Sequence, residues 1–91
     1  MALTKELVVD KIEVLEMGQV QVRTATRVKE DGTVLSSSFH RHVVEPSTKA
    51  SGSWADTDIS GEDARVQAVA NATWTDSVKT AYQEMVDAQS L

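Results

Sequence analysis

The dipeptide Asp31-Gly32 lies between two stretches rich in β-branched residues, and it constrains the fold of this chain more than any other feature. Asp-Gly is typical of the two-residue turn of a β-hairpin, because both central residues of that turn adopt positive φ. We therefore expect antiparallel strands over residues 19–30 and 33–45. Apolar and polar residues alternate in the first of these strands, as is typical of a strand with one buried face.

A third strand is expected over residues 7–16, before the hairpin. A two-residue loop between this strand and the next would place Val22 opposite Glu13, whereas a three-residue loop places Val22 opposite Ile12. Only the second arrangement pairs apolar with apolar side chains. We therefore expect the longer loop, with Gly18 in the left-handed conformation of a bulge.

The turn also predicts which residues of the two hairpin strands face each other. Even-numbered residues of the strand over 19–30 and odd-numbered residues of the strand over 33–45 should share the core face. The expected pairs are Val28 with Leu35, Thr24 with Phe39, and Val20 with Val43.

The second half of the chain changes to a helical period after a polar connector. Ser, Thr, Gly and Asp dominate residues 47–59, which are expected to form this connector on the surface. The Ser60 hydroxyl is expected to cap a helix over residues 61–73, and a second helix is expected over residues 76–89. Both helices should pack on one face of the three-stranded meander, giving an α+β fold with Trp74 as a core anchor.

The 91 residues are expected to form a single domain, with a β meander over 1–46, the connector, and a helical pair over 60–91. A domain of this size has a modest core and is commonly stabilised by oligomerisation. The formal net charge of -5 argues against nucleic acid or an anionic membrane as a direct partner. No apolar run is long enough for a membrane span, so we expect a soluble protein made in the cytoplasm. The chain has no cysteine, which excludes disulfides and thiolate metal sites.

Two histidines, His40 and His42, are two residues apart on an expected strand, so their side chains should project from the same face. Two imidazoles are too few for a metal site unless symmetry-related copies add more. The expected register places Arg23 and Gln21 opposite them, and neither is an acidic ligand. We therefore favour solvated or interface histidines over a metal ion shared between subunits.

The segment from Asp56 to Glu62 resembles the start of a calcium-binding loop. Asp56, Asp58 and Ser60 supply oxygens at alternate positions, before a glycine. The closing position is Gln67 rather than a bidentate glutamate, and no helix is expected before the loop. An acidic helix start is therefore favoured over a calcium site.

A local basic patch stands out on this acidic chain. It has two interpretations: a solvated face paired with nearby glutamates, or a docking site for an acidic protein surface. Its members are Arg23, Arg27, Lys29 and Arg41, and the expected pairing partners are Glu13, Glu30 and Glu45.

The serine run over residues 36–38 precedes His40, but no glycine-framed turn and no third group to orient a base accompany it. We therefore assign no catalytic residues and no cofactor, and we expect the chain not to be an enzyme.

Several segments together resemble a group of small proteins encoded by tailed bacteriophages, including those of cyanobacteria. These segments are residues 9–14, 20–26, 30–32, 38–43 and 63–74. The resemblance covers most of the chain except residues 47–57, where this sequence carries extra length. It implies a component of the virion or of its assembly, without enzymatic activity and without catalytic residues to transfer.

The expected function is therefore a small structural protein, present in many copies in a phage particle. It would bind other virion proteins at the tail, neck or fibre attachment through its open sheet face or an edge strand, as a homo-oligomer or multi-copy assembly. The alternatives are a capsid cement or decoration protein, and a cytoplasmic phage protein that binds a host factor. The candidate contact residues are Phe39, His40, Arg41, His42, Arg23 and Trp54.

Overall fold

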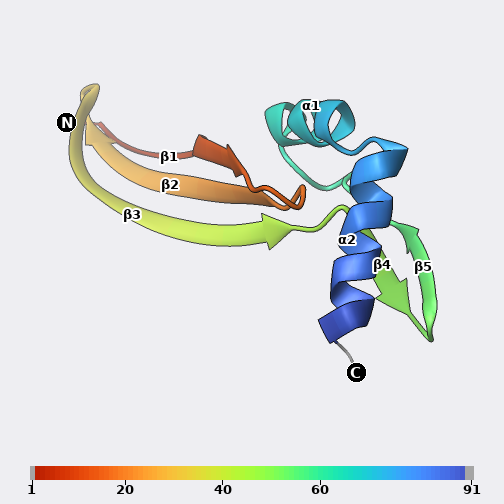
Figure 1. Ribbon diagram of the computed structural model, residues 1–91. Coiled ribbons are helices and arrows are strands. Elements are labelled where there is room, and N and C mark those ends of the chain that lie inside the picture. Colours follow the sequence, from red (N-terminus) through yellow and green to blue (C-terminus); the bar gives the residue numbers. More distant parts are fainter. Residues whose placement is uncertain (1, 90–91) are drawn as a thin grey trace.

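The computed structural model describes residues 2–89 and has an α+β fold, as expected (Figure 1). Along the chain, a three-stranded antiparallel sheet in the order β1-β2-β3 comes first, a small two-stranded sheet follows, and two helices end the chain. The strands are β1 (Leu3–Val14), β2 (Val20–Glu30), β3 (Thr33–Val44), β4 (Ser47–Ala50) and β5 (Ser53–Asp56), and the helices are α1 (Ala64–Thr73) and α2 (Asp76–Gln89).

Both turns of the large sheet are as the sequence predicts. Asp31 and Gly32 have φ of 50° and 86°, so both central residues of the hairpin turn are left-handed. The loop between β1 and β2 closes through a 2.9 Å hydrogen bond from the Leu15 N–H to the Gln19 carbonyl, which leaves three residues in the loop. Gly18, the last of these, has a φ of 88°.

The expected register between β1 and β2 is confirmed, with Ile12 opposite Val22. Beyond this pair a bulge between Val9 and Lys11 shifts the register. Strand β1 also begins before the expected residue 7, at Leu3, because β2 is long enough to pair with the polar N-terminal residues.

The expected register between β2 and β3 is wrong by one residue. Next to the turn Lys29 pairs with Val34, but the next pair is Val28 with Ser36, so Leu35 is an extra residue in a bulge. A one-residue shift moves every later side chain of β3 to the other face. The actual pairs are Thr24 with His40, Ala25 with Phe39, and Val20 with Val44.

The expected surface connector contains a second hairpin, β4–β5. Ser51 and Gly52 have φ of 51° and 79°, so they form a turn of the same left-handed kind. This hairpin was not predicted from the sequence, because its short strands have no apolar pattern of their own. They are held instead by α2, where Asp87 forms a 2.8 Å ion pair with Lys49.

The first helix starts later than expected, at Ala64. Its cap is Asp63, whose carboxylate accepts a 2.9 Å hydrogen bond from the Arg65 N–H, rather than Ser60. The second helix spans the expected residues, and the Thr75 hydroxyl accepts a 3.3 Å hydrogen bond from the Val78 N–H at its start.

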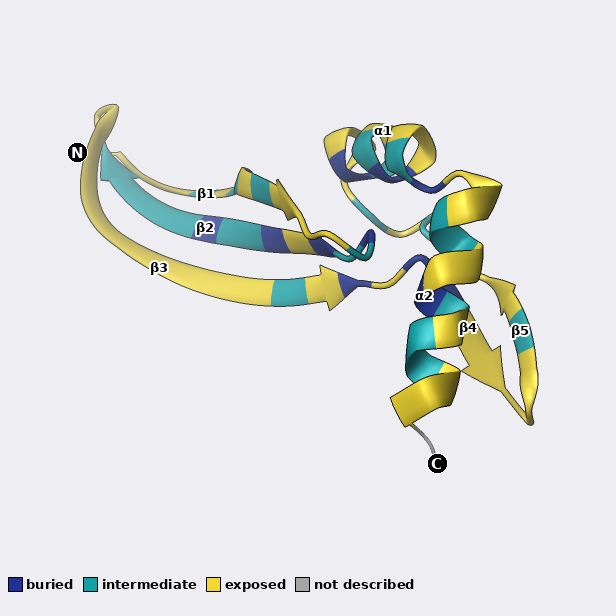
Figure 2. Cartoon of the chain, in the orientation of Figure 1, coloured by how far each residue is buried: buried dark blue, intermediate teal, exposed yellow. Residues whose placement is uncertain are grey.

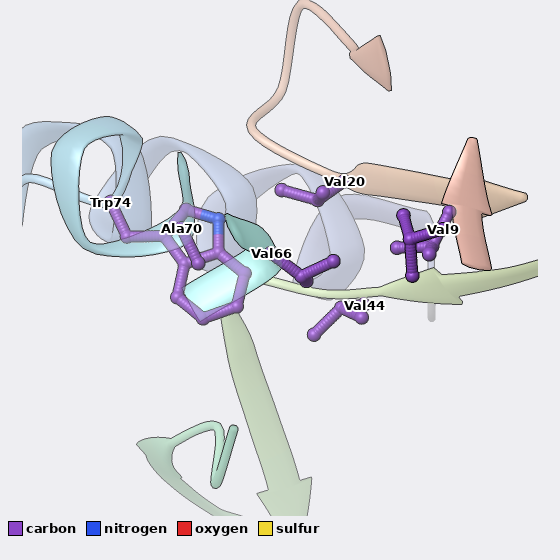
Figure 3. Close-up of a cluster of buried hydrophobic side chains, with 7 residues drawn as sticks. Val9, Val20, Val44, Val66, Ala70 and Trp74 are labelled. Carbon is purple, nitrogen blue, oxygen red and sulfur yellow. The ribbon is translucent and has the colours of Figure 1, made fainter. Parts of the chain in front are cut away.

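The hydrophobic core lies at one end of the large sheet, where α1 packs on it (Figure 3). Its buried members are Val9, Val20, Val22, Val44, Val66, Ala70 and Trp74. The strands continue well beyond α1, and β3 is exposed along most of its length (Figure 2). The molecule is therefore elongated, with extents of 57 × 25 × 23 Å.

Candidate docking surface

The large sheet has two faces with different side chains. We call one the helix-side face, because α1 covers one end of it; on β2 it carries Val20, Val22, Thr24, Thr26 and Val28. We call the other the outer face; on β2 it carries Gln21, Arg23, Ala25, Arg27 and Lys29. Beyond α1, residues 3–8 and 24–40 form what we call the distal half of the sheet (Figure 1).

Phe39, Arg23 and Asp10 form a connected group on the outer face. The Arg23 guanidinium donates two hydrogen bonds to the Asp10 carboxylate, at 2.9 and 2.8 Å, and lies 4.6 Å from the centre of the Phe39 ring. This hydrogen-bonded ion pair lowers the pKa of Asp10 and raises that of Arg23. Ala25 is completely buried on the face that carries this group, although no helix covers it.

A second charged group lies further along the same face. The Glu6 carboxylate lies 3.1 Å from the Lys29 ammonium and 3.4 Å from the Arg27 guanidinium. The hydrogen bond with Lys29 is the main reason that the pKa of Glu6 is lowered. The ion-pair partners of the basic patch are therefore Asp10 and Glu6; of the three glutamates expected from the sequence, Glu13 contributes only the charge that helps to raise the pKa of Arg23.

Arg41 is the exposed member of the basic patch. Within residues 2–89 it forms no ion pair. Its register partner is Arg23, which has the same charge and is itself paired with Asp10. It lines an open pocket of about 160 Å³ on the outer face, between β1, β2 and β3. Exposed Val43 lines the same pocket, and Phe39 is half exposed on the same strand face. The structure thus brings three candidate contact residues together: Arg23, Phe39 and Arg41.

His40 and His42 lie on the helix-side face, away from this group. Their rings stack with centroids 6.3 Å apart, so the prediction that they share a face is confirmed. Their register partners are Thr24 and Val22, not Arg23 and Gln21 as expected, because of the bulge in β3. His42 Nε2 lies 2.7 Å from a Glu62 carboxylate oxygen, an acidic partner that no local sequence pattern indicated.

Trp54 lies in the small hairpin rather than on the large sheet. Its ring meets that of Tyr82 edge to face at 6.1 Å, and its N–H donates a 3.4 Å hydrogen bond to Asp87. The sequence left open whether Trp54 covers the connector or contacts a partner. In this structure its half-buried ring covers α2.

The calcium-like residues are occupied by other interactions. Asp56 forms a 3.0 Å ion pair with Lys79, and Asp58 accepts a 2.9 Å hydrogen bond from the Ser60 N–H. That hydrogen bond lowers the pKa of Asp58. Among the residues that the structure describes, no three His, Asp or Glu side chains are grouped so that they could hold a metal ion.

No protein-family model, curated protein or solved structure matches this chain. Over residues 2–89, neither helix combines the length and the apolar composition that crossing a bilayer requires.

Proposed function

We propose that this chain is a small, non-enzymatic structural protein of a tailed phage particle, and that it docks to other virion proteins through the distal half of its sheet. One observation carries the proposal: this half extends beyond α1 with uncovered side chains on its faces and an outer strand at each edge. Unpaired edge strands and open sheet faces are surfaces that proteins use to add a partner strand or to pack against a neighbour. The resemblance to small phage proteins supports the same assignment.

The docking centre that we propose is the group of Phe39, Arg41 and Arg23 on the outer face, where the distal half begins. Aromatic and arginine side chains contribute a large share of the binding energy in protein interfaces. Arg23 is already neutralised by Asp10, so it holds the Phe39 ring in place, whereas exposed Arg41 is available to a partner. A fitting partner would offer an apolar recess for Phe39 beside a carboxylate for Arg41.

The proposed location is the tail, neck or fibre attachment. A decoration protein of the capsid would also be abundant in particles, whereas a phage protein that binds a host factor would be absent from them. Mass spectrometry of particles purified from the phage that encodes this chain separates these cases. We expect many copies per particle, retained with the tail fraction after heads and tails are separated. Absence from particles would contradict the proposal, and recovery with heads alone would favour decoration.

A variant tests the docking centre itself. Phe39→Asp should reduce the amount of this protein in purified particles by at least about tenfold, because it replaces the aromatic contact by a charge. The matched control is Ala81→Asp, which places the same charge at an exposed position of α2. Equal incorporation of both variants would contradict the assigned centre.

A further inference from the structure

The helix-side face of the distal half is a bare, nearly uncharged surface. Leu3 and Leu7 are 61% and 65% exposed there, although they continue the same row of side chains that is buried under α1 at Val9. Charge on this surface is confined to Lys5 and Glu30 near the end of the sheet. The other members are Thr24, Thr26, Val28, Thr33, Ser36, Ser38 and His40.

The outer face differs in this respect. There, ion pairs join Asp10 with Arg23 and Glu6 with Lys29 across the strands, and Ala25, which is on the same face, has no exposed surface. A sheet of three strands is stable when it has a hydrophobic face or packs against a helix, and α1 covers only one end of this sheet. Both faces are exposed on β3, but ion pairs span the strands of the outer face, whereas the helix-side face of the distal half has no such pairs within the described part of the chain and exposes Leu3 and Leu7.

The whole molecule exposes more surface than a compact chain of its mass, and the excess is similar to what one protein contributes to a stable interface. The accessible surface is 6052 Å², whereas a compact monomer of 9.9 kDa exposes roughly 5,200 Å². The excess of roughly 850 Å² is close to the share of about 800 Å² that each partner buries in a standard interface. The radius of gyration of 16.9 Å exceeds the value of about 12 Å for a compact chain of this length.

The helix α1 has an uncovered surface of matching character. Val66 and Ala70 face the sheet, and the opposite side of the helix presents exposed Ala64, Ala68 and Ala72. Arg65 is the one charged residue within this helix, and it reaches back to donate a hydrogen bond to the Val9 carbonyl. A helix without a charged face is typical of one that is covered on both sides.

We propose that the occupant of the helix-side face is a second copy of this chain, related by a two-fold axis. The strands bend so that the sheet is concave on the side that carries α1 (Figure 1). With the two sheets antiparallel, each distal half covers the alanine side of the partner's α1, and the two contacts are identical by symmetry. A parallel arrangement would bring both α1 helices to the same place between the sheets, so it is excluded.

Light scattering after size-exclusion chromatography tests this dimer, with concentrations from about 1 to 100 μM. We expect a molar mass twice the chain's 9.9 kDa. Leu7→Glu and Ala68→Arg should each weaken the dimer by at least about 100-fold, because each buries an unpaired charge. The matched control is Val43→Glu, a similarly exposed position at 53% on the outer face, which should leave the dimer intact.

A wild-type mass of one chain throughout this range would overturn the proposal, and would leave the surface to a different protein. A dimer that resists both Leu7→Glu and Ala68→Arg would also overturn it, in favour of edge-to-edge pairing. Far-UV circular dichroism checks that each variant is folded.

Cross-linking provides a second measurement, because the chain has no native cysteine. Equimolar Leu7→Cys and Ala68→Cys proteins should form mixed disulfides in excess over symmetric ones; a statistical mixture would contradict the arrangement. These experiments use the purified chain alone, so their result is independent of whether the chain is found in phage particles.

Discussion

The indole N–H of Trp74 donates a 2.7 Å hydrogen bond to the backbone carbonyl of Gly18, which joins the end of α1 to the loop between β1 and β2. Trp74 is 9% exposed, and the hydrogen bond itself is buried. The prediction of Trp74 as a core anchor is therefore confirmed, and the hydrogen bond adds a polar attachment to its apolar packing. This contact ties the sheet to the helical half of the molecule.

We predict that Trp74→Phe lowers the free energy of unfolding by about 1–3 kcal/mol, since the Gly18 carbonyl stays buried without its donor. The melting temperature should fall by at least about 4 °C, as measured by circular dichroism. Trp54→Phe is the control, because its 3.4 Å hydrogen bond to Asp87 is exposed. Similar losses in the two variants would argue against a special role for the buried hydrogen bond.

Gly18 is required for a second, steric reason. A Cβ atom at this position would lie 2.5 Å from Val78 Cγ1 and 3.0 Å from Pro46 Cγ, in addition to the unfavourable φ of 88°. Gly32 has a similar φ of 86° but nothing within 4 Å of the added atom. Gly18→Ala should therefore lower the free energy of unfolding by at least about 2 kcal/mol more than Gly32→Ala. In Gly32→Ala the only cost is the strained backbone conformation. Equal losses in urea unfolding would contradict the close approach of Val78.

Short-range chemistry explains why the turns of the large sheet could be predicted. Asp31-Gly32 and Gly18 need left-handed backbone, and few residues other than glycine and asparagine or aspartate adopt it readily. The pairing of Ile12 with Val22 follows because both side chains lie at the covered end of the sheet. There, a wrong register would expose apolar surface.

The bulge at Leu35 could not be predicted, because both faces of the sheet are uncovered where it occurs. The apolar residues Leu35, Phe39 and Val43 share a parity that suggests a core face, yet all three are at least half exposed. Register is strongly specified only where one face is buried. Val44 is the β3 residue that packs in the core instead. The bulge places the Phe39 ring on the outer face, in contact with the Arg23 guanidinium.

The partners of the site residues also come from distant parts of the sequence. Asp10 reaches Arg23 from the bulge of β1, and Glu62 reaches His42 from the segment before α1. Neither partner is close in sequence. The second hairpin is a related case, because contacts with α2 hold its polar strands. Ser51-Gly52 is itself a turn signal, but the strands on either side of it have no apolar pattern.

Acid should weaken the connection between β1 and β2. The hydrogen bond from Arg23 lowers the pKa of Asp10 in the folded state below its ordinary value of 3.8. Its stabilisation is therefore complete above that value and is lost as the pH falls through the folded-state pKa. Asp10→Asn should show a smaller drop in melting temperature between neutral pH and about pH 2 than the wild type.

A double-mutant cycle provides the control for this effect. In an Arg23→Gln background, Asp10→Asn should change the acid dependence less, because the main partner that lowers the Asp10 pKa is gone and only the weaker effects of Arg27 and a backbone hydrogen bond remain. If Asp10→Asn changed the acid dependence equally in both backgrounds, Arg23 would not be the main cause of the lowered Asp10 pKa.

Alkali should act through Tyr82, the one tyrosine in the chain. Burial, together with the nearby Glu45 carboxylate, raises the pKa of its phenol from 10.0 to about 12. Because the folded-state pKa is the higher one, the stabilisation is complete below pH 10 and is lost as the pH rises toward 12. Absorbance of the phenolate should therefore titrate near 12 in the folded protein and near 10 in denaturant. Tyr82→Phe should retain more of its neutral-pH stability in this range than the wild type, and a folded-state midpoint near 10 would show that Tyr82 is open to solvent.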